Sequence, residues 1–109
     1  PSIQSNSSII DAVLIMTEKK YGCVVVLDKN NKIKGIITDG DLRRSISKID
    51  MSKKATSIMK SKPVLAKGDL LVSSAIVLMN KYSITSLIIA NQNKPIGIVN
   101  IKKCLENDT

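Results

Sequence analysis

Histidine, phenylalanine and tryptophan are absent from this chain of 109 residues, and only two tyrosines are present. Without histidine, the chain lacks the commonest general base at neutral pH, the histidine-dependent catalytic triads and most zinc sites. With aromatic residues at 2%, it also lacks the flat side chains on which single-stranded nucleic acids stack. We therefore expect no catalytic residues, no metal site, no cofactor and no nucleic-acid partner.

Long hydrophobic runs are also missing, because none approaches the roughly 18 residues needed to cross a membrane. The two cysteines, Cys23 and Cys104, lack the spacing of a redox or metal motif. A disulfide between them is one interpretation, and two reduced thiols in a cytoplasmic protein is the simpler one. We expect a cytoplasmic protein without a membrane partner. The chain begins at Pro1 rather than methionine, which is typical of a piece of a longer protein.

What the chain has in excess is positive charge, with 17 lysines and arginines against nine acidic residues and a net charge of +8. The basic residues are spread along the chain, which is more typical of a solvated surface than of a nucleic-acid footprint. A basic nucleic-acid binder remains a minor alternative, whose affinity would collapse with salt. The charge favours anionic small ligands.

The most informative feature is an internal repeat. Ala12 and Met16 recur as Ala75 and Met79, and the stretch 35–38 recurs as 97–100. The first copy is one residue longer between these two points, and we place the extra residue between the helix and the following strand. Such short units cannot bury a core alone, so we expect them to pack face to face by a pseudo-twofold relation, with ligand crevices between them.

Each copy predicts a helix, a hairpin and a short second helix. In the first copy the expected elements are a helix capped by Asn6 or Ser7 and ending near Lys20, strands over Cys23–Leu27 and Ile33–Thr38, and a helix over 40–47. In the second they are a helix over 70–81 capped by Asp69, strands over Ser86–Ala90 and Pro95–Asn100, and a helix over 101–107. Between the copies we expect a short helix over 55–60 and a strand over Val64–Ala66. The fold class is α/β (α+β).

A helix with Ala-x-x-x-Met, a hairpin and then Gly-apolar-apolar-Thr-x-x-Asp resembles a tandem pair of CBS (cystathionine β-synthase) domains. The resemblance covers essentially the whole chain and implies two β-α-β-β-α units, with unit 1 over 1–50 and a linker plus unit 2 over 51–109. Three stretches, 35–44, 84–89 and Ser57–Lys60, are similar to the C-terminal CBS pair of arabinose-5-phosphate isomerases of the KpsF/GutQ type. A CBS pair of a sugar nucleotidyltransferase is the competing parent.

The resemblance implies a parent that interconverts ribulose 5-phosphate and arabinose 5-phosphate for the synthesis of Kdo and lipopolysaccharide. Its catalytic part would be a separate N-terminal sugar-isomerase (SIS) domain, so this fragment is expected not to be an enzyme. The expected role is a regulatory module that binds a nucleotide or nucleotide-sugar such as AMP, ATP or CMP-Kdo, and that forms a homodimer through its CBS units. A ligand-free dimerisation module is the alternative.

Thr38, Asp39, Gly40 and Asp41 are the candidate ligand-binding residues, because this stretch contacts the ligand in nucleotide-binding CBS pairs. A carboxylate such as Asp41 can accept hydrogen bonds from both ribose hydroxyls, the Thr38 hydroxyl can bond a phosphate or ribose oxygen, and Gly40 lets a ligand approach the backbone. Arg43 or Arg44 can supply a donor fork to phosphate. Cys23 is placed beside the expected crevice, where it either contacts the ligand or packs in the core.

A competing interpretation of the same residues needs no ligand, because Thr-x-x-Asp at a helix start can act as a capping-box device. Asp39 is open to pairing with a neighbouring cation instead of a ligand. The second unit departs from the pattern, since Asn100 stands at the Thr position and Lys103 at the Asp position. A lysine cannot accept hydrogen bonds from a ribose, so we expect at most one competent site.

Overall fold

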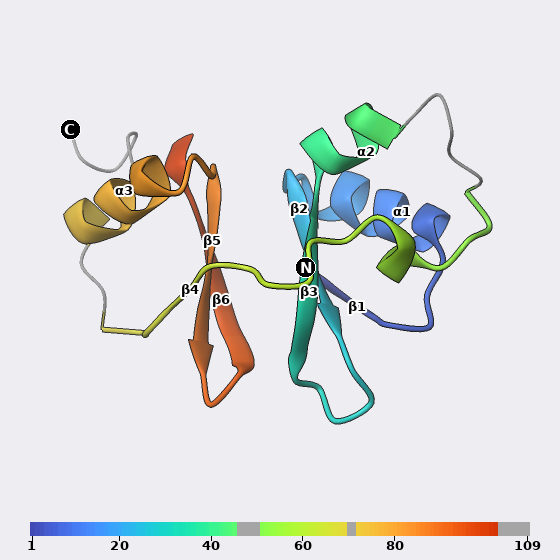
Figure 1. Cartoon of the computed structure of the whole chain (residues 1–109), viewed down its shortest axis with the longest axis horizontal. Helices are drawn as coiled ribbons and strands as arrows, with labels where there is room; N and C mark the ends of the chain where they lie inside the picture. Colours follow the sequence, from blue (N-terminus) through green and yellow to red (C-terminus); the bar gives the residue numbers. More distant parts are fainter. Residues whose placement is uncertain (46–50, 70–71, 103–109) are drawn as a thin grey trace. The chain divides into compact units, whose positions relative to one another are not determined.

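The computed structural model describes residues 1–45, 51–69 and 72–102. The chain divides into two compact units, Pro1–Pro63 and Val64–Thr109. Each unit contains a three-stranded sheet with a helix packed against it, as Figure 1 shows. No helix in these three ranges has the length and hydropathy to cross a membrane.

The two sheets have the same topology. In the first unit the elements are β1 (Ser2–Gln4), α1 (Ile9–Lys19), β2 (Cys23–Leu27), β3 (Ile33–Thr38), α2 (Asp39–Ser45) and the 3₁₀ turn η2 (Ala55–Ser57). In the second they are β4 (Leu65–Ala66), α3 (Val72–Lys81), β5 (Ser86–Asn91) and β6 (Lys94–Asn100). The strand orders are β1-β2-β3 and β4-β5-β6, in which the first pair is parallel and the second antiparallel.

The repeated Ala and Met residues confirm the predicted equivalence of the two main helices. Ala12 and Met16 of α1 are buried against the first sheet, and Ala75 and Met79 of α3 are buried against the second. Small and flexible apolar side chains at spacing i and i+4 lie on one face of a helix, so both helices dock through the same two positions. The cores around them are aliphatic, as the composition requires.

The start of α1 differs from the prediction, because Ser8 rather than Asn6 or Ser7 is its N-cap. The Ser8 hydroxyl accepts the backbone N–H of Asp11 at 3.3 Å, and the Asp11 carboxylate accepts the backbone N–H of Ser8 at 3.0 Å. This reciprocal pair is a capping box, which satisfies two backbone donors at once and therefore selects Ser8 over its neighbours.

The extra residue of the first unit lies in the hairpin turn, and its placement between helix and strand was wrong. Cys23 pairs with Thr38 and Ser86 pairs with Asn100, so the two strands begin in equivalent register. At the other end of the hairpin, five residues separate the pair Leu27 and Ile33, but four separate Ala90 and Pro95. The shorter turn is built on two residues of the left-handed region, Gln92 and Asn93, as tight two-residue hairpins require.

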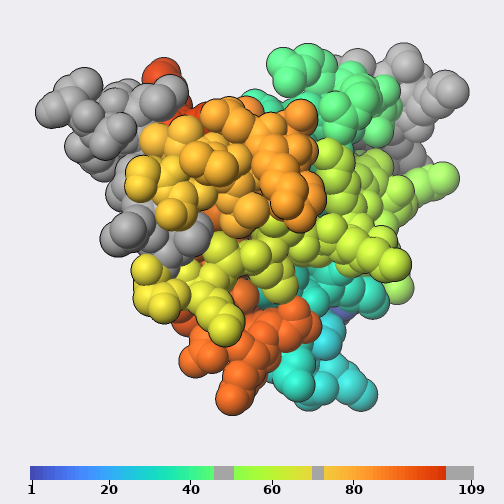
Figure 2. Space-filling model, turned by 60° about the vertical axis from the view of Figure 1, so that its left-hand side comes forward, coloured from blue at the N-terminus to red at the C-terminus, as the bar shows by residue number. Residues whose placement is uncertain are grey.

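A segment that we call the strap, residues 51–60, packs on the first unit, whereas the sequence predicted only a helix over its second part, 55–60. Its helical part is the single turn η2; near the other end Lys60 and Ile36 exchange backbone hydrogen bonds of 2.8 and 3.0 Å at the edge of β3. The carbonyls of Lys53 and Met51 accept the N–H groups of Ile9 and Ile10 in the first turn of α1. In Figure 2 the strap, yellow-green, lies at the surface.

These contacts explain why the first compact unit ends at Pro63, later than the division at residue 50 expected from the repeat. The strap satisfies donors of α1 that have no partner within the helix, and Ala55 is fully buried in the first core. The predicted helix start at Leu70, the predicted helix ends beyond 45 and 102, and Cys104 lie outside the described residues.

Candidate functional site

The candidate site lies where β3 ends and α2 begins. The backbone N–H and the hydroxyl of Thr38 both donate to Asp41 Oδ2, at 2.8 and 3.0 Å. In return the Asp41 N–H reaches Thr38 Oγ1 at 3.2 Å. The Thr-x-x-Asp stretch therefore acts as a capping box for α2, which is the ligand-free use of this motif that the sequence left open.

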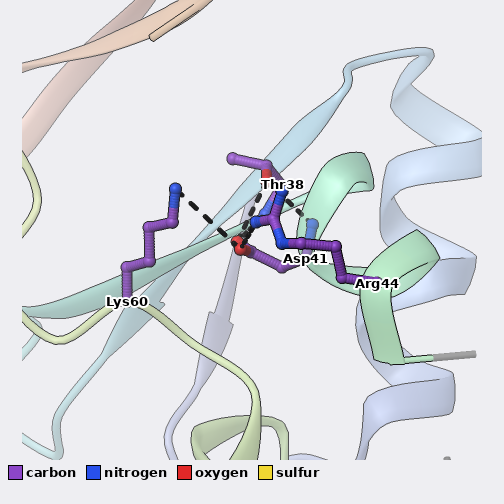
Figure 3. Close-up of polar contacts among 4 residues, drawn as sticks. All are labelled: Thr38, Asp41, Arg44 and Lys60. Atoms are coloured by element: carbon purple, nitrogen blue, oxygen red, sulfur yellow. Dashed lines mark hydrogen bonds and ion pairs between the residues drawn. The ribbon is translucent and has the colours of Figure 1, made fainter. Parts of the chain in front are cut away.

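The Asp41 carboxylate is nevertheless unlike an ordinary cap. It is 6% exposed, and its Oδ1 accepts a hydrogen bond from Arg44 Nη2 at 2.5 Å. The Lys60 ammonium approaches the same oxygen at 4.0 Å from the strap. Figure 3 shows the two cations reaching the carboxylate from different segments, with Thr38 beside it. A buried carboxylate is stable only when it is paired in this way.

Gly40 and Arg43 lie near this cluster. A Cβ atom added at Gly40 would stand 3.3 Å from Arg44 Nη1 and 3.8 Å from Arg43 Nη2, so both guanidinium groups lie over the glycine. Among the described residues, no carboxylate pairs with Arg43. Gly40 therefore leaves room for two cationic side chains at the start of α2, and of the two arginines Arg44 is the one that contacts Asp41.

Asp39 and Cys23 are not part of this cluster. The Asp39 carboxylate lies near Gly22, where an added Cβ would meet its Oδ2 at 3.5 Å. It lines a separate pocket of about 270 Å³ between α1 and α2, together with residues such as Thr17 and Leu42. Cys23 is 0% exposed in β2, which favours the core role over ligand contact.

Lys60 was missed by sequence reasoning, and no local pattern could have identified it. Its contact with Asp41 depends on the pairing of the strap with Ile36, which joins residues far apart in the sequence. The choice between Arg43 and Arg44 had a usable signal, because residues at i and i+3 lie on one face of a helix. Asp41 and Arg44 have this spacing.

The equivalent position in the second unit has a different chemistry. Asn100 ends β6 as Thr38 ends β3, and its Oδ1 accepts the backbone N–H of Lys102 at 2.9 Å. The amide caps the following turn, and up to Lys102, where the described residues end, no carboxylate joins it. Lys103, at the position of Asp41, lies outside the described residues.

The arrangement in the first unit offers both signs of charge within one cluster. A carboxylate oxygen is an acceptor that suits a diol, and a guanidinium and an ammonium are donors that suit a phosphate. Such a pairing matches a ligand that carries hydroxyl groups and negative charge together. Both oxygens of Asp41 already have protein partners, so a diol would have to share or replace one of them.

Comparison with known proteins identifies a family model that matches almost the whole chain. The model of the CBS domain matches residues 1–48 and 55–108. The arabinose 5-phosphate isomerase KdsD of Yersinia pestis is 34% identical over 107 residues, which cover 96% of this chain and 33% of that protein. The chain spans about a third of the length of the curated relatives that it matches.

Solved structures share the fold at low sequence identity. A CBS domain protein from Pyrobaculum aerophilum complexed with AMP has a TM-score of 0.85 and 17% identity, and the match covers 93% of this chain and 79% of that one. The CBS domain pair of protein MJ0100, in complex with 5′-methylthioadenosine and S-adenosyl-L-methionine, has a TM-score of 0.85 and 24% identity. That match covers 100% of this chain and 91% of the other.

Proposed function

This chain belongs to the CBS domain family, and from that premise we propose that it is a non-catalytic regulatory module that binds a nucleotide or nucleotide-sugar at its first unit. The observation that carries the proposal is the buried Asp41 carboxylate, joined to Thr38 and held between Arg44 and Lys60. The ribose hydroxyls bind Asp41, which Thr38 holds in place, and the phosphate binds the arginines, with Arg43 as a second donor. Gly40 leaves the approach open.

Two related structures support the chemical class of this ligand. One is complexed with AMP and the other with 5′-methylthioadenosine and S-adenosyl-L-methionine, all of which carry a ribose. The expected ligands AMP, ATP and CMP-Kdo each carry a ribose and at least one phosphate. Binding would regulate an attached domain by favouring one conformation of the module over another.

Calorimetry with AMP, ATP and CMP-Kdo at millimolar concentration tests the proposal, with Asp41→Ala as the key variant. Asp11→Ala is a matched control, because Asp11 closes the same kind of capping box at Ser8. We expect at least one nucleotide to bind the wild type and the Asp11→Ala chain, and none to bind Asp41→Ala. No heat from any of the three, or equal binding by Asp41→Ala, would contradict the proposal.

For the whole protein we propose an arabinose-5-phosphate isomerase of Kdo and lipopolysaccharide biosynthesis, located in the cytoplasm. The support is the 34% identity to KdsD along nearly the whole of this chain. The remaining two thirds of such a protein would contain the SIS domain that performs the isomerisation. Assay of the full-length protein with arabinose 5-phosphate tests this parent, and transfer of a nucleotidyl group to a sugar phosphate would identify the nucleotidyltransferase instead.

A ligand-free dimerisation module is the second candidate function, and two observations favour it. The capping box satisfies Asp41 without a ligand. In addition, the equivalent helices leave apolar side chains in solvent, Leu14 of α1 at 60% exposure and Val77 of α3 at 67%. Light scattering on the wild type and on Leu14→Asp tests association through these helices. A stable homodimer with no nucleotide binding would favour this second function.

A further inference from the structure

Arg44 covers the part of Asp41 that a ribose would need. Oδ2 is held by the backbone N–H and the hydroxyl of Thr38, both of which belong to the capping box. Oδ1 is held by the Arg44 guanidinium. Each oxygen of the carboxylate therefore accepts a hydrogen bond from the protein, and Oδ1 is the oxygen that can exchange its partner without breaking the helix cap.

The Arg44 contact is also the one that can be exchanged most easily. The Arg44 side chain is 65% exposed, whereas that of Asp41 is 7% exposed, so the guanidinium can move into solvent or onto a ligand while the carboxylate stays in place with its Thr38 donors. Lys60 remains within 4.0 Å of Oδ1 from the strap. If Arg44 leaves, the buried carboxylate therefore keeps one positive charge nearby.

We propose that Arg44 is a latch on the nucleotide site, which closes Asp41 when the site is empty and moves to the ligand's phosphate when a nucleotide binds. This inference rests on the proposed function, and it adds a source of specificity to it. A nucleoside has to displace Arg44 from Asp41 and offers the guanidinium nothing in exchange. A nucleotide offers it a phosphate, which forms a charge-assisted bidentate pair. Arg44 therefore favours phosphorylated ligands in two ways: it competes with the ribose of a nucleoside for Asp41, and it adds a phosphate contact for a nucleotide.

The substitution Arg44→Met separates these two effects, because it removes the charge and keeps much of the apolar stem. Without the competing guanidinium, the nucleoside should bind at least about twofold more tightly, the lower limit set by an ion pair in which only one partner is exposed. The affinity for the nucleotide should fall by about tenfold or more, as expected for the loss of a hydrogen bond to a charged group. Opposite shifts for two ligands that differ only in a phosphate are not expected of a residue with a purely structural role.

Calorimetry is performed with AMP and adenosine, and with CMP and cytidine, on the wild type, Arg44→Met and Arg43→Met. Arg43→Met removes the same charge from the adjacent residue, which makes no contact with Asp41 among the described residues. It should weaken the nucleotide without tightening the nucleoside. Circular dichroism melting of the three chains establishes that each is folded at the assay temperature.

The outcomes separate the latch from the site itself. Tighter nucleoside binding by Arg44→Met alone supports the latch, including the case in which the wild type binds no nucleoside. If the wild type binds a nucleotide and Arg44→Met leaves nucleoside affinity unchanged or lower, the latch is wrong and the proposed site stands. If neither nucleotide nor nucleoside binds the wild type or Arg44→Met, the proposed site fails, and the latch fails with it.

Discussion

Gly35 and Gly97 occupy the same position in the two hairpins, opposite Val26 and Ile89, yet their surroundings differ. A Cβ added at Gly35 would stand 2.5 Å from the backbone oxygen of Lys60 and 2.7 Å from the sulfur of Met59. A Cβ added at Gly97 would meet nothing within 4 Å among the described residues. The same residue is thus required in the first unit by the strap and is free of such a constraint in the second.

The ends of the two hairpins differ as well. Thr38 caps its helix together with a buried carboxylate that has two cations near it, whereas Asn100 caps the next turn with its own half-buried amide. Repetition of a fold therefore does not repeat a site, because the site depends on residues that the fold leaves free to vary. The first unit has both the strap and the charged cluster, and the two are joined through Lys60.

Adding the same methyl group to both glycines should give the largest difference between the two units. Gly35→Ala forces the new Cβ against a backbone carbonyl, so the strap must shift, at a cost of about 1–3 kcal/mol in the free energy of unfolding. Gly97→Ala should change it by no more than about 0.5 kcal/mol. Urea unfolding measures both, and equal losses in the two variants would mean that the strap does not constrain Gly35.

Removal of the two caps should give the next largest difference. Thr38→Val deletes the hydroxyl that accepts the Asp41 N–H and donates to its carboxylate, at a cost of about 1–2 kcal/mol for a partly buried cap. Asn100→Ala removes the amide cap and should cost about 0.5 kcal/mol. Thermal melting of both variants checks the order. A larger loss for Asn100→Ala would show that the cluster at Thr38 adds nothing to its helix cap.

Lys60→Met separates the contribution of the strap's backbone hydrogen bonds from that of the Lys60 charge. Lys60 holds β3 through its backbone N–H and carbonyl, which the substitution leaves in place. Its ammonium is 4.0 Å from Asp41 on a side chain that is 57% exposed, so its loss should cost less than about 0.5 kcal/mol. Urea unfolding beside Gly35→Ala provides the scale. If Lys60→Met lowered the free energy of unfolding as much as Gly35→Ala does, the charge of Lys60, and not its backbone, would be the stabilising contact of the strap.

The smallest expected effect is a difference between the two hairpin turns in how stability depends on pH. The backbone N–H groups of Lys32 and Asn30 hydrogen-bond to Asp28 and hold its pKa below the usual value of an aspartate. A carboxyl whose pKa is lowered in the folded state stabilises the fold above its unfolded pKa, and this contribution is lost as the pH falls through the folded pKa. The wild type should therefore lose more stability in acid than Asp28→Asn.

Urea midpoints at neutral pH and at about pH 3 measure this difference. The turn of the second hairpin, Gln92 and Asn93, contains no carboxyl group, so Gln92→Ala is a control that should shift the midpoint equally at both pH values. An acid response of Asp28→Asn identical to that of the wild type would remove Asp28 from the pH dependence.

The strands and the main helices could be predicted because their signals are local. The bounds of β2 and β3 are those expected from the run of β-branched residues before and after the turn at Asp28, and the Ala and Met pairs gave the docking faces of α1 and α3. Errors arose where several residues of similar propensity compete. Asn6, Ser7 and Ser8 are all good caps, and only the reach of Asp11 selects Ser8.

The strap and the charged cluster were harder, because they depend on contacts between distant residues. A helix was predicted from Ala55 to Lys60, but only Ala55–Ser57 is helical. Near the end of the stretch, Lys60 instead forms a β-bridge with Ile36. Sequence reasoning named Thr38 and Asp41 correctly as neighbours at a helix start, since that relation is local. It could not place Lys60, and it left open the roles of Asp39, whose carboxylate lies beside Gly22, and of Cys23, which is buried in β2 opposite Thr38.

The hydrogen bonds from Ile9 and Ile10 to the strap have a practical consequence for anyone who wishes to produce the first repeat in isolation. A gene truncated at the internal symmetry point, near residue 50, would encode a protein with two unmet donors at the head of α1 and a hole where Ala55 belongs. A stop codon placed after Pro63 keeps the carbonyl groups that accept from these two donors, and it keeps Ala55 in the core. The repeat in the sequence and the compact unit of the structure therefore have different ends.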